Sequence, residues 1–324
     1  MGKKLQDITA PIAAKLQLVD DSIIRQLTTG IPILDQGAQH LFVRGGKRIR
    51  ASVVLLASGL RGANPEGIVD LAAAAEIVHA ATLVHDDIID QAMFRRGDLA
   101  VSKKFGEKAA VLAGDYMYTM GLTTAVKYGV SDIFPVMVSG TSDMVKGELY
   151  QLEYSNIHSI NEEHYNNIIE LKTARFMATC AKIGAIMGGL NEAEQNDVWL
   201  FGLKIGLAFQ IIDDTLDVAE NESVTGKDSG NDFMDGKITL PFIHLLETLP
   251  APERAALVEF AETPTQDKWP SVRKRIIEAG GVTYAHRAAQ KLVDESVALL
   301  EQFPESDSRK ILQDIAFFIV DRDF

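Results

Sequence analysis

The sequence contains a single cysteine, Cys180, so no disulfide bond can form within the chain. This cysteine lies in an apolar stretch from Met177 to Met187, where a packed thiol in a reducing compartment is the simplest interpretation. No apolar run reaches the length of a membrane span, and residues 1–4 lead into a mixed polar segment rather than a signal peptide. We therefore expect a soluble, cytoplasmic protein without a transmembrane segment.

Positive charge is also scarce. The 32 Lys and Arg residues are outnumbered by 45 Asp and Glu residues, which leaves a formal net charge of −13. Non-specific nucleic-acid binding needs a basic face that displaces counterions from phosphates, so this balance argues against a nucleic-acid partner. An anionic ligand must therefore be held locally, either by clusters of Lys and Arg or by metal ions bound to carboxylates.

The 324 residues contain no Pro- or Ser-rich linker, no low-complexity tract and no shift in composition, so we predict a single domain over 1–324. Apolar residues recur at intervals of three and four, and alternating β-branched segments are missing. The predicted fold class is therefore all-α, a single large helical bundle. Helices are predicted over 8–28, 33–42, 48–60, 66–90, 105–129, 131–153, 162–189 and 195–218, with shorter ones towards the C-terminus.

Two aspartate-rich motifs end long apolar helices. Residues 84–90 read VHDDIID, and residues 211–217 read IIDDTLD. The first and last aspartates of each motif lie about one turn apart on one face, because an α-helix advances one turn in ~3.6 residues. Two such helices that face each other would form a carboxylate-lined mouth above an apolar interior.

Carboxylates crowded on an apolar helix repel one another and lose hydration unless cations or hydrogen bonds compensate. Oxygen ligands suit hard cations, and Mg²⁺ commonly completes its coordination with water and phosphate oxygens, so a diphosphate is the natural ligand. A single DDxxD motif could equally be a solvated helix end. Two matched copies make that alternative much weaker.

Two basic clusters accompany these motifs. Residues 45–50 read GGKRIR at a predicted helix start, and Arg95-Arg96-Gly97 follows the first aspartate motif. Arg side chains match phosphate oxygens geometrically, Lys supplies a compact charge, and the amides of a helix N-terminus add donors. Either cluster alone is a weak signal, since basic residues usually solubilise a surface. Beside the acidic motifs, both favour diphosphate binding.

Together these motifs resemble those of the trans-isoprenyl diphosphate synthases, also called polyprenyl synthetases. The similarity covers most of the chain. It rests on GGKRIR, on LVHDDIID with the following RRG, and on AGDYM at 113–117, KTA at 172–174, FQIIDDTLD at 209–217 and GKDSGNDFMDGKITLP at 226–241. The resemblance implies an all-α isoprenoid synthase fold with a central active-site cavity. It also implies a trans-prenyltransferase that condenses isopentenyl diphosphate with an allylic diphosphate to give an all-trans polyprenyl diphosphate.

The resemblance further implies roles for individual residues. Three Mg²⁺ ions are expected, with Asp86, Asp90 and Asp213 as principal ligands and with Asp87, Asp214 and Asp217 in or near the coordination shell. Isopentenyl diphosphate would be held by Lys47, Arg50, His79 and Arg96, and the allylic diphosphate by Arg95, Lys172, Thr173, Gln210, Lys227 and Lys237. The residues expected to carry the catalysis are Asp86, Asp90, Asp213, Lys172 and Lys237.

The implied reaction is ionisation of the allylic diphosphate, attack by the alkene of isopentenyl diphosphate, and loss of a proton that the leaving pyrophosphate can take. Its physical basis is electrostatic stabilisation of developing charge in a pocket that keeps water from the allylic cation. A homodimer with middle helices at its interface is also implied. The apolar product would favour transient contact with a membrane surface.

Product length should depend on the side chains one turn before Asp86 on the same face, because the growing chain meets them first. These are Ala81 and Thr82, whereas short-chain members of the family carry bulky aromatics there. We therefore expect a medium- to long-chain product, with farnesyl or geranylgeranyl diphosphate synthase as the alternative. Candidates for the tunnel floor are Phe134, Met137 and Met144.

Other interpretations fit the motifs less well. Glu76 and His79 have the ExxH spacing of di-iron bundles, but such a site needs two of these motifs and only one is present. His85 receives no role, because an ordinary packed histidine accounts for it. A terpene cyclase would need neither the second DDxxD nor the GKR and RRG clusters. A non-catalytic regulatory subunit would lose central aspartates or lysines, and all of them are present.

Three segments depart from the family pattern. Ala51 stands where a proline is common, and the segment 98–102 lacks the Pro-Thr that usually follows RRG. The C-terminal residues 321–324 resemble the basic tails that cover the site in relatives, yet they carry two acidic residues. The loop after RRG and the tail are therefore the parts whose arrangement the resemblance predicts least.

Overall fold

The chain is described by a computed structural model that covers residues 4–43, 46–95, 97–219 and 230–322. Its first half consists of α1 (Leu5–Thr9), η1 (Ala10–Ile12), α2 (Ala13–Leu27), α3 (Pro32–Val43), α4 (Ile49–Ser58), α5 (Ile68–Ile89), β1 (Phe94–Arg95), β2 (Asp98–Leu99), α6 (Val101–Phe105), α7 (Glu107–Lys127) and α8 (Ile133–Tyr154). Its second half consists of α9 (Glu162–Ile169), η2 (Glu170–Ala174), α10 (Arg175–Met187), α11 (Glu192–Ala219), α13 (Asn231–Met234), α14 (Leu240–Thr248), α15 (Ala251–Ala261), α16 (Trp269–Glu278), α17 (Gly281–Leu299) and α18 (Asp307–Val320).

The predicted all-α class is confirmed, and each long predicted helix has a counterpart. The predicted helix 8–28 is divided by the 3-10 turn η1, where Pro11 cannot donate a backbone hydrogen bond. The predicted helix 162–189 contains a π-helical turn, η2, between α9 and α10. The antiparallel ribbon of β1 and β2 has no predicted counterpart, because strands of two residues carry no alternation pattern.

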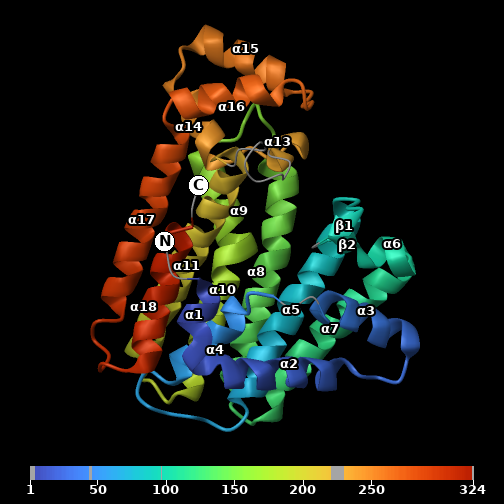
Figure 1. Cartoon of the computed structure of the whole chain (residues 1–324), viewed down its shortest axis with the longest axis vertical. Helices are drawn as coiled ribbons and strands as arrows, with labels where there is room; N and C mark the ends of the chain where they lie inside the picture. Colours follow the sequence, from blue (N-terminus) through green and yellow to red (C-terminus); the bar gives the residue numbers. More distant parts are fainter. Residues whose placement is uncertain (1–3, 44–45, 96, 220–229, 323–324) are drawn as a thin grey trace.

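The long helices α5, α8, α10 and α11 run side by side through the middle of the molecule (Figure 1). The helices α17 and α18 cover α11 on one side, and α7 covers α5. The ribbon, α6 and α3 lie beyond α5, whereas α13 to α16 form the upper end in Figure 1. Because α1 contacts α18, the two ends of the described chain lie in the same region.

The central helix α5 is buried along most of its length. The side chains of residues 72–75, four consecutive alanines, are completely buried and let neighbouring helices approach closely. Within the described ranges, α5 is the one helix long and apolar enough to cross a membrane, and 67% of its most apolar window is buried inside the molecule. Apolar residues all around a helix are also what a core position requires.

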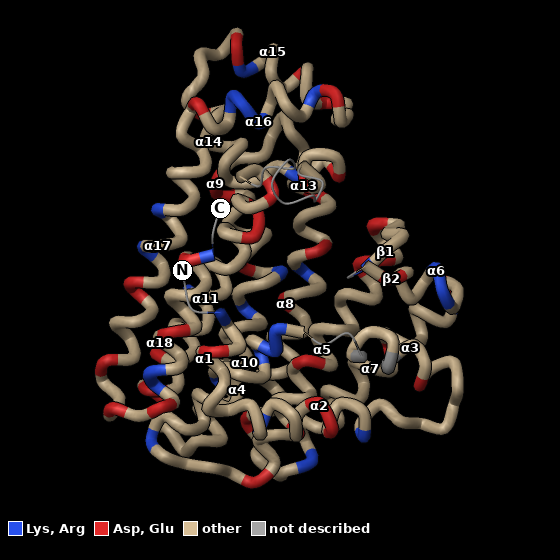
Figure 2. Tube along the Cα trace, viewed as in Figure 1, with Lys and Arg blue, Asp and Glu red and all other residues tan. Residues whose placement is uncertain are grey.

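Charged residues of both signs are distributed over the whole trace. In the coloured part of Figure 2, Lys and Arg are interspersed with Asp and Glu rather than gathered on one side. The C-terminal ends of α5 and α11 carry the two aspartate motifs. The fold therefore brings acidic residues to one region although the motifs lie more than a hundred residues apart in sequence.

Candidate active site

Aspartates of both motifs line one cavity of about 280 Å³, here called the aspartate cavity. Asp86 and Asp90 reach it from the end of α5, and Asp213 reaches it from α11. Lys172 and Lys237 line the same cavity. The structure thus brings together the five residues that the resemblance marks as catalytic.

A second cavity of about 1120 Å³, here called the large cavity, adjoins the first. Both are lined by Leu83, Asp86, Lys172, Thr173, Gln210 and Asp213. The large cavity is also lined by Lys47, Arg50 and His79, the basic group predicted for isopentenyl diphosphate. Of the other predicted diphosphate contacts, Arg96 and Lys227 lie outside the described residues. A basic group therefore stands at a cavity that opens onto the aspartates.

Asp86 lies where its charged form is poorly solvated. Burial raises the pKa of Asp86 to about 6; the positive charge of Lys172 opposes this rise, and the negative charges of Glu148 and Asp90 add to it. A bound cation would favour the charged carboxylate and offset its lost hydration. This carboxylate is thus suited to metal binding.

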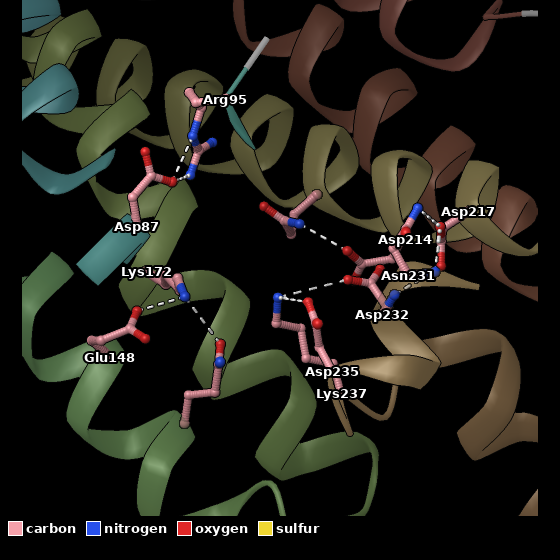
Figure 3. A network of polar contacts seen from close by, with 12 residues as sticks. Asp87, Arg95, Glu148, Lys172, Asp214, Asp217, Asn231, Asp232, Asp235 and Lys237 are labelled. Atoms are coloured by element: carbon pink, nitrogen blue, oxygen red, sulfur yellow. Dashed lines mark hydrogen bonds and ion pairs between the residues drawn. The ribbon is translucent and has the colours of Figure 1, made fainter. Parts of the chain in front are cut away.

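Asp87, the next residue, has a different partner. Its side chain is 1% exposed, and one carboxylate oxygen accepts hydrogen bonds from Arg95 Nε at 2.8 Å and Nη2 at 2.5 Å (Figure 3). Arg95 belongs to β1 and lines the aspartate cavity. The Asp87–Arg95 pair therefore anchors the β1–β2 ribbon to the end of α5. Metal binding by Asp87 stays a prediction.

In the second motif, Asp214 has hydrogen-bond partners of its own. Asp214 is buried and accepts hydrogen bonds from Tyr165 Oη at 2.6 Å and from Gln210 Nε2 at 2.8 Å. Burial and the nearby charge of Asp232 raise the pKa of Asp214. Gln210 Oε1 in turn accepts a hydrogen bond from Thr173 Oγ1 at 2.9 Å. Asp214 thus holds two residues that line the aspartate cavity.

Asp217 holds the short helix that precedes Lys237. Its carboxylate accepts hydrogen bonds from the backbone N–H groups of Asn231 and Asp232, each at 3.1 Å, at the start of α13 (Figure 3). Carboxylates at this position satisfy the free amides of a helix N-terminus. The second motif therefore positions α13 as well as presenting Asp213.

Lys237 lies among carboxylates. Its Nζ is 3.0 Å from Asp235 Oδ2 and 4.0 Å from Asp232 Oδ1. Burial opposes the charged ammonium, but the Asp235 hydrogen bond and the charge of Asp232 outweigh it and raise the pKa of Lys237. Lys237 is therefore a cation at neutral pH, as a diphosphate contact requires.

Lys172 and Thr173 project from the π-helical turn η2. Lys172 Nζ lies 2.5 Å from Glu148 Oε2 and 3.3 Å from Gln151 Oε1, both on α8. A Cβ atom at Gly147, also on α8, would come within 2.5 Å of the Lys172 backbone nitrogen. The missing side chain at Gly147 therefore lets α8 pack directly against the widened turn.

The end of the chain reaches the same site. The Arg322 side chain is 9% exposed; its Nη1 lies 3.4 Å from Asp213 Oδ1, and its guanidinium lies over the Phe209 ring at 4.3 Å. Its Nε and Nη2 atoms are buried without a hydrogen-bond partner. The described part of the tail thus places a cation beside Asp213. Residues 323–324 lie outside the described residues.

Residues near the predicted tunnel differ in exposure. Ala81 is completely buried, whereas Thr82 lines the large cavity and donates a hydrogen bond to the His79 carbonyl at 2.7 Å. Met137 and Met144 are buried, but Phe134 is 40% exposed. His85 lies outside this group: its Nε2 is 3.2 Å from the Val111 carbonyl oxygen of α7, a contact between two packed helices.

Sequence reasoning missed several residues that shape the site: Glu148, Gln151, Tyr165 and Asp232. Asp232 lies inside the GKDSGNDFMDGK segment, so this motif is the sequence signal that could identify it. Glu148 and Gln151 are one turn apart on α8, which is a common spacing without a signal of its own. Their contacts with Lys172 depend on the packing of α8 against η2.

The aspartate cavity fits a hard divalent cation. Its acidic donors are carboxylate oxygens from α5 and α11, and the positive charges of Lys172 and Arg95 do not fully offset the burial of Asp86. In the part of the chain that the structure describes, no three His, Cys, Asp or Glu side chains form a ready chelating group. Mg²⁺ commonly takes one or two protein carboxylates and completes its shell with water and phosphate, so this arrangement suits ions that bind with a diphosphate.

Residues 31–278 match the family model of the polyprenyl synthetases. Octaprenyl diphosphate synthase of Escherichia coli is 31% identical over 99% of this chain and 99% of its own length. The short chain isoprenyl diphosphate synthase of Methanothermobacter thermautotrophicus is 34% identical over 95% of this chain and 96% of its own length. A crystal structure of the Caulobacter crescentus polyprenyl synthase, complexed with calcium and isoprenyl diphosphate, has a TM-score of 0.92 at 30% identity, with 99% of each chain covered.

The helical fold and its carboxylate-lined cavity define an isoprenoid synthase of the all-α type. The chain belongs to the polyprenyl synthetase family and is a trans-prenyltransferase. The family binds diphosphates with divalent metal ions. The resemblance drawn from the sequence motifs is thereby confirmed.

Proposed function

We propose that this chain is a cytoplasmic, single-domain enzyme that condenses isopentenyl diphosphate with an allylic diphosphate and gives a product of more than four isoprene units. One observation carries the reaction: the aspartate cavity, with Asp86, Asp90 and Asp213, adjoins the large cavity, which is lined by Lys47, Arg50 and His79. Two diphosphates can therefore be held side by side, which a cyclase with a single substrate does not need.

The allylic diphosphate occupies the aspartate cavity in this proposal. Lys172, Lys237 and Arg95 neutralise its oxygens, and Thr173 and Gln210 orient it through their mutual hydrogen bond. Three Mg²⁺ ions, bound through Asp86, Asp90 and Asp213 and assisted by Asp87, Asp214 and Asp217, would supply Lewis-acid stabilisation of the departing pyrophosphate.

Isopentenyl diphosphate binds to the basic group at the large cavity. Lys47, Arg50 and His79 hold its diphosphate, and Arg96 is the fourth predicted contact. The C–O bond to pyrophosphate breaks first, the alkene then attacks the allylic cation, and the departing pyrophosphate takes the proton whose loss forms the new double bond. The longer product is the next allylic substrate.

Small side chains before the first motif support the longer product. Ala81 and Thr82 present no bulky group one turn before Asp86. We expect Ala81→Phe and Thr82→Phe to shorten the product while allylic turnover continues, because an aromatic ring there blocks the growing chain. Mass spectrometry of the products, with thermal melting to confirm folding, measures this. If both variants fold and product length is unchanged, the tunnel assignment is wrong.

A homodimer is part of the proposal. Exposed apolar residues recur along α7 and α8, with Leu112 and Leu152 each 66% exposed, Leu149 61% exposed and Val145 50% exposed. The α8 positions are spaced by four and three residues, so they form one helix face, and an apolar face of this kind is characteristic of an interface. Release of an apolar product would bring the enzyme into transient contact with a membrane surface.

The deciding experiment incubates purified chain with Mg²⁺, isopentenyl diphosphate and each allylic primer, with Asp86→Ala as the control. Products longer than four isoprene units that need Mg²⁺ and are absent from the control support the proposal. Products of three or four units would make the chain a farnesyl or geranylgeranyl diphosphate synthase. No elongation with any primer would favour a cyclase or a regulatory subunit.

A further inference from the structure

The middle cation of the GGKRIR segment, Arg48, has an unusual backbone. Its φ is 48° and its ψ is 33°, which is the left-handed helical region. Among the described non-glycine residues, Gln91 alone shares a positive φ. L-residues avoid this region because Cβ approaches the following carbonyl group, so the surrounding structure must hold Arg48 there.

The Arg48 guanidinium is held by three other helices. Its Nε donates to Asp20 Oδ1 of α2 at 2.7 Å, its Nη1 lies 3.9 Å from Glu76 Oε2 of α5, and it lies over the Phe42 ring of α3 at 5.3 Å. The Arg48 and Glu76 side chains are each 8% exposed. A buried ion pair with a second carboxylate and an aromatic face is a fixed arrangement rather than a solvated surface contact.

Glu76 has a second contact in the same segment. Its Oε1 accepts a hydrogen bond from the Ala51 backbone N–H at 3.0 Å. This amide is one of the free donors at the start of α4, and Arg48 at the N-cap position has no side-chain oxygen to accept it. Ala51 makes this hydrogen bond possible, because the proline that is common at this position in the family has no N–H to donate.

We propose that Arg48 and Glu76 are positioning residues that fix the basic group at the large cavity, an inference that rests on the proposed function. Lys47 precedes Arg48, and Arg50 is the second residue of α4. His79 lies one turn after Glu76 on the same face of α5. One carboxylate therefore ties the segment that carries two of the predicted diphosphate contacts to the helix that carries the third. This accounts for the Glu76–His79 spacing without a metal site.

Two substitutions test the positioning role, and Glu76→Gln also separates it from a simple charge effect, because loss of the Arg48 cation would weaken anion binding in either case. Arg48→Gly keeps the left-handed backbone accessible and removes the guanidinium, whereas Glu76→Gln keeps an acceptor for the Ala51 amide and removes the charge. Loss of a negative charge should strengthen anion binding if only the field matters. Positioning predicts the opposite, because Arg48 loses its partner and the segment loses its place.

The experiment measures steady-state kinetics with both substrates and, by calorimetry, the binding of inorganic pyrophosphate. The binding is measured in EDTA, because without divalent cations the carboxylates of the aspartate cavity repel an anion and pyrophosphate reports on the basic group. For Arg48→Gly and Glu76→Gln we expect KM for isopentenyl diphosphate and Kd for pyrophosphate to rise by about tenfold or more, with kcat and the allylic KM within about twofold. Arg48→Lys should restore part of the affinity. Arg61→Ala, which breaks an ion pair with Glu194 away from both cavities, is the matched control and should change melting temperature only.

Tighter pyrophosphate binding by Glu76→Gln would overturn the proposal, as would unchanged binding or an equal effect in Arg61→Ala. A different result would overturn the proposed function: the wild-type chain binds pyrophosphate but does not condense isopentenyl diphosphate with any primer. In that case the pyrophosphate titrations still decide whether Arg48 and Glu76 position the basic group.

Discussion

Asp86 and Asp87 are neighbours in sequence with different surroundings. Asp86 lines both cavities, and burial raises its pKa to about 6. Asp87 is paired with Arg95 beneath the β1–β2 ribbon. A helix turns by ~100° per residue, so adjacent side chains leave it in different directions. In the first motif this separates Asp86 from Asp87, whereas Asp213 and Asp214 of the second motif both line the aspartate cavity.

We expect Asp86→Asn and Asp87→Asn to fail in different ways. Asp86→Asn should lower kcat by at least about a hundredfold with little loss of stability, because its carboxylate would hold the metal ions that stabilise the departing pyrophosphate. Asp87→Asn should lower the free energy of unfolding by about 1–3 kcal/mol, because Arg95 loses its charged partner. Kinetics and urea unfolding of both variants measure this. An Asp87→Asn variant that is as stable as wild type but inactive would show that Asp87 acts in metal binding and not in anchoring the β1–β2 ribbon.

Asp70 is a buried carboxylate that lines neither the aspartate cavity nor the large cavity. Its oxygens accept hydrogen bonds from Ser22 Oγ at 2.6 Å, Arg25 Nη2 at 2.6 Å, Lys127 Nζ at 2.9 Å and Tyr128 Oη at 2.5 Å. Burial by itself would raise the pKa of Asp70, but the hydrogen bonds from Ser22, Tyr128 and Lys127 lower it well below its ordinary value. One carboxylate thus joins α2, α5 and α7.

Because the pKa of Asp70 is lower in the folded chain than in the unfolded chain, its contribution is complete at neutral pH and is lost as the pH falls below 3.8. We expect Asp70→Asn to lower the free energy of unfolding by about 2 kcal/mol at pH 7. The difference from wild type should stay constant down to about pH 5 and narrow below about pH 4. Urea unfolding across this range tests it, and a difference that never narrows would contradict the assignment.

At the scale of secondary structure, the π-helical turn η2 determines where Lys172 and Thr173 point. Glycines on both flanking helices make room for it: a Cβ at Gly147 of α8 would approach the Lys172 backbone, and one at Gly206 of α11 would lie 2.6 Å from Ala174 Cα. A π turn inserts one extra residue and so rotates the following side chains relative to a regular helix. The positions of Lys172 and Thr173 therefore depend on close packing of α8 and α11 against η2.

We expect Gly147→Ala to displace η2 and lower kcat by about tenfold to a hundredfold, because its Cβ would meet backbone atoms that cannot rotate away. Gly140→Ala is the matched control, since Gly140 also lies on α8 but a Cβ there would meet the Thr179 side chain. Both substitutions should destabilise the fold by about 1–3 kcal/mol through overpacking. Equal kinetic effects of the two variants would show that η2 is not the sensitive element.

At the scale of the whole molecule, the exposed apolar face of α8 contrasts with the mixed charges elsewhere on the chain. We expect the wild-type protein in solution to have twice the single-chain mass of 35.4 kDa, because it is a dimer. The Leu149→Glu variant should have the mass of a single chain, because a charge on this face would prevent association. Leu18→Glu, at a 53% exposed position of α2, is the control and should leave the mass unchanged. Light scattering after size-exclusion chromatography measures both, and a wild-type monomer would refute the dimer.

The sequence by itself determined the helices, the family and the position of each motif. Apolar periodicity is a local property, so α5, α7, α8 and α11 could be predicted from it. The DDxxD repeats and basic clusters were specific enough to identify the reaction class. These signals survive without tertiary structure because each depends on residues that are close in sequence.

Tertiary structure alone decided which side chain of each motif meets the cavity. Asp87 pairs with Arg95, Asp217 caps α13, and Arg48, which lines the large cavity like Lys47 and Arg50, pairs with the buried Glu76. Arg322 lies more than a hundred residues from Asp213 and still contacts it. Contacts of this kind depend on how distant helices pack, and a pattern confined to one segment carries no information about the element that will lie against it.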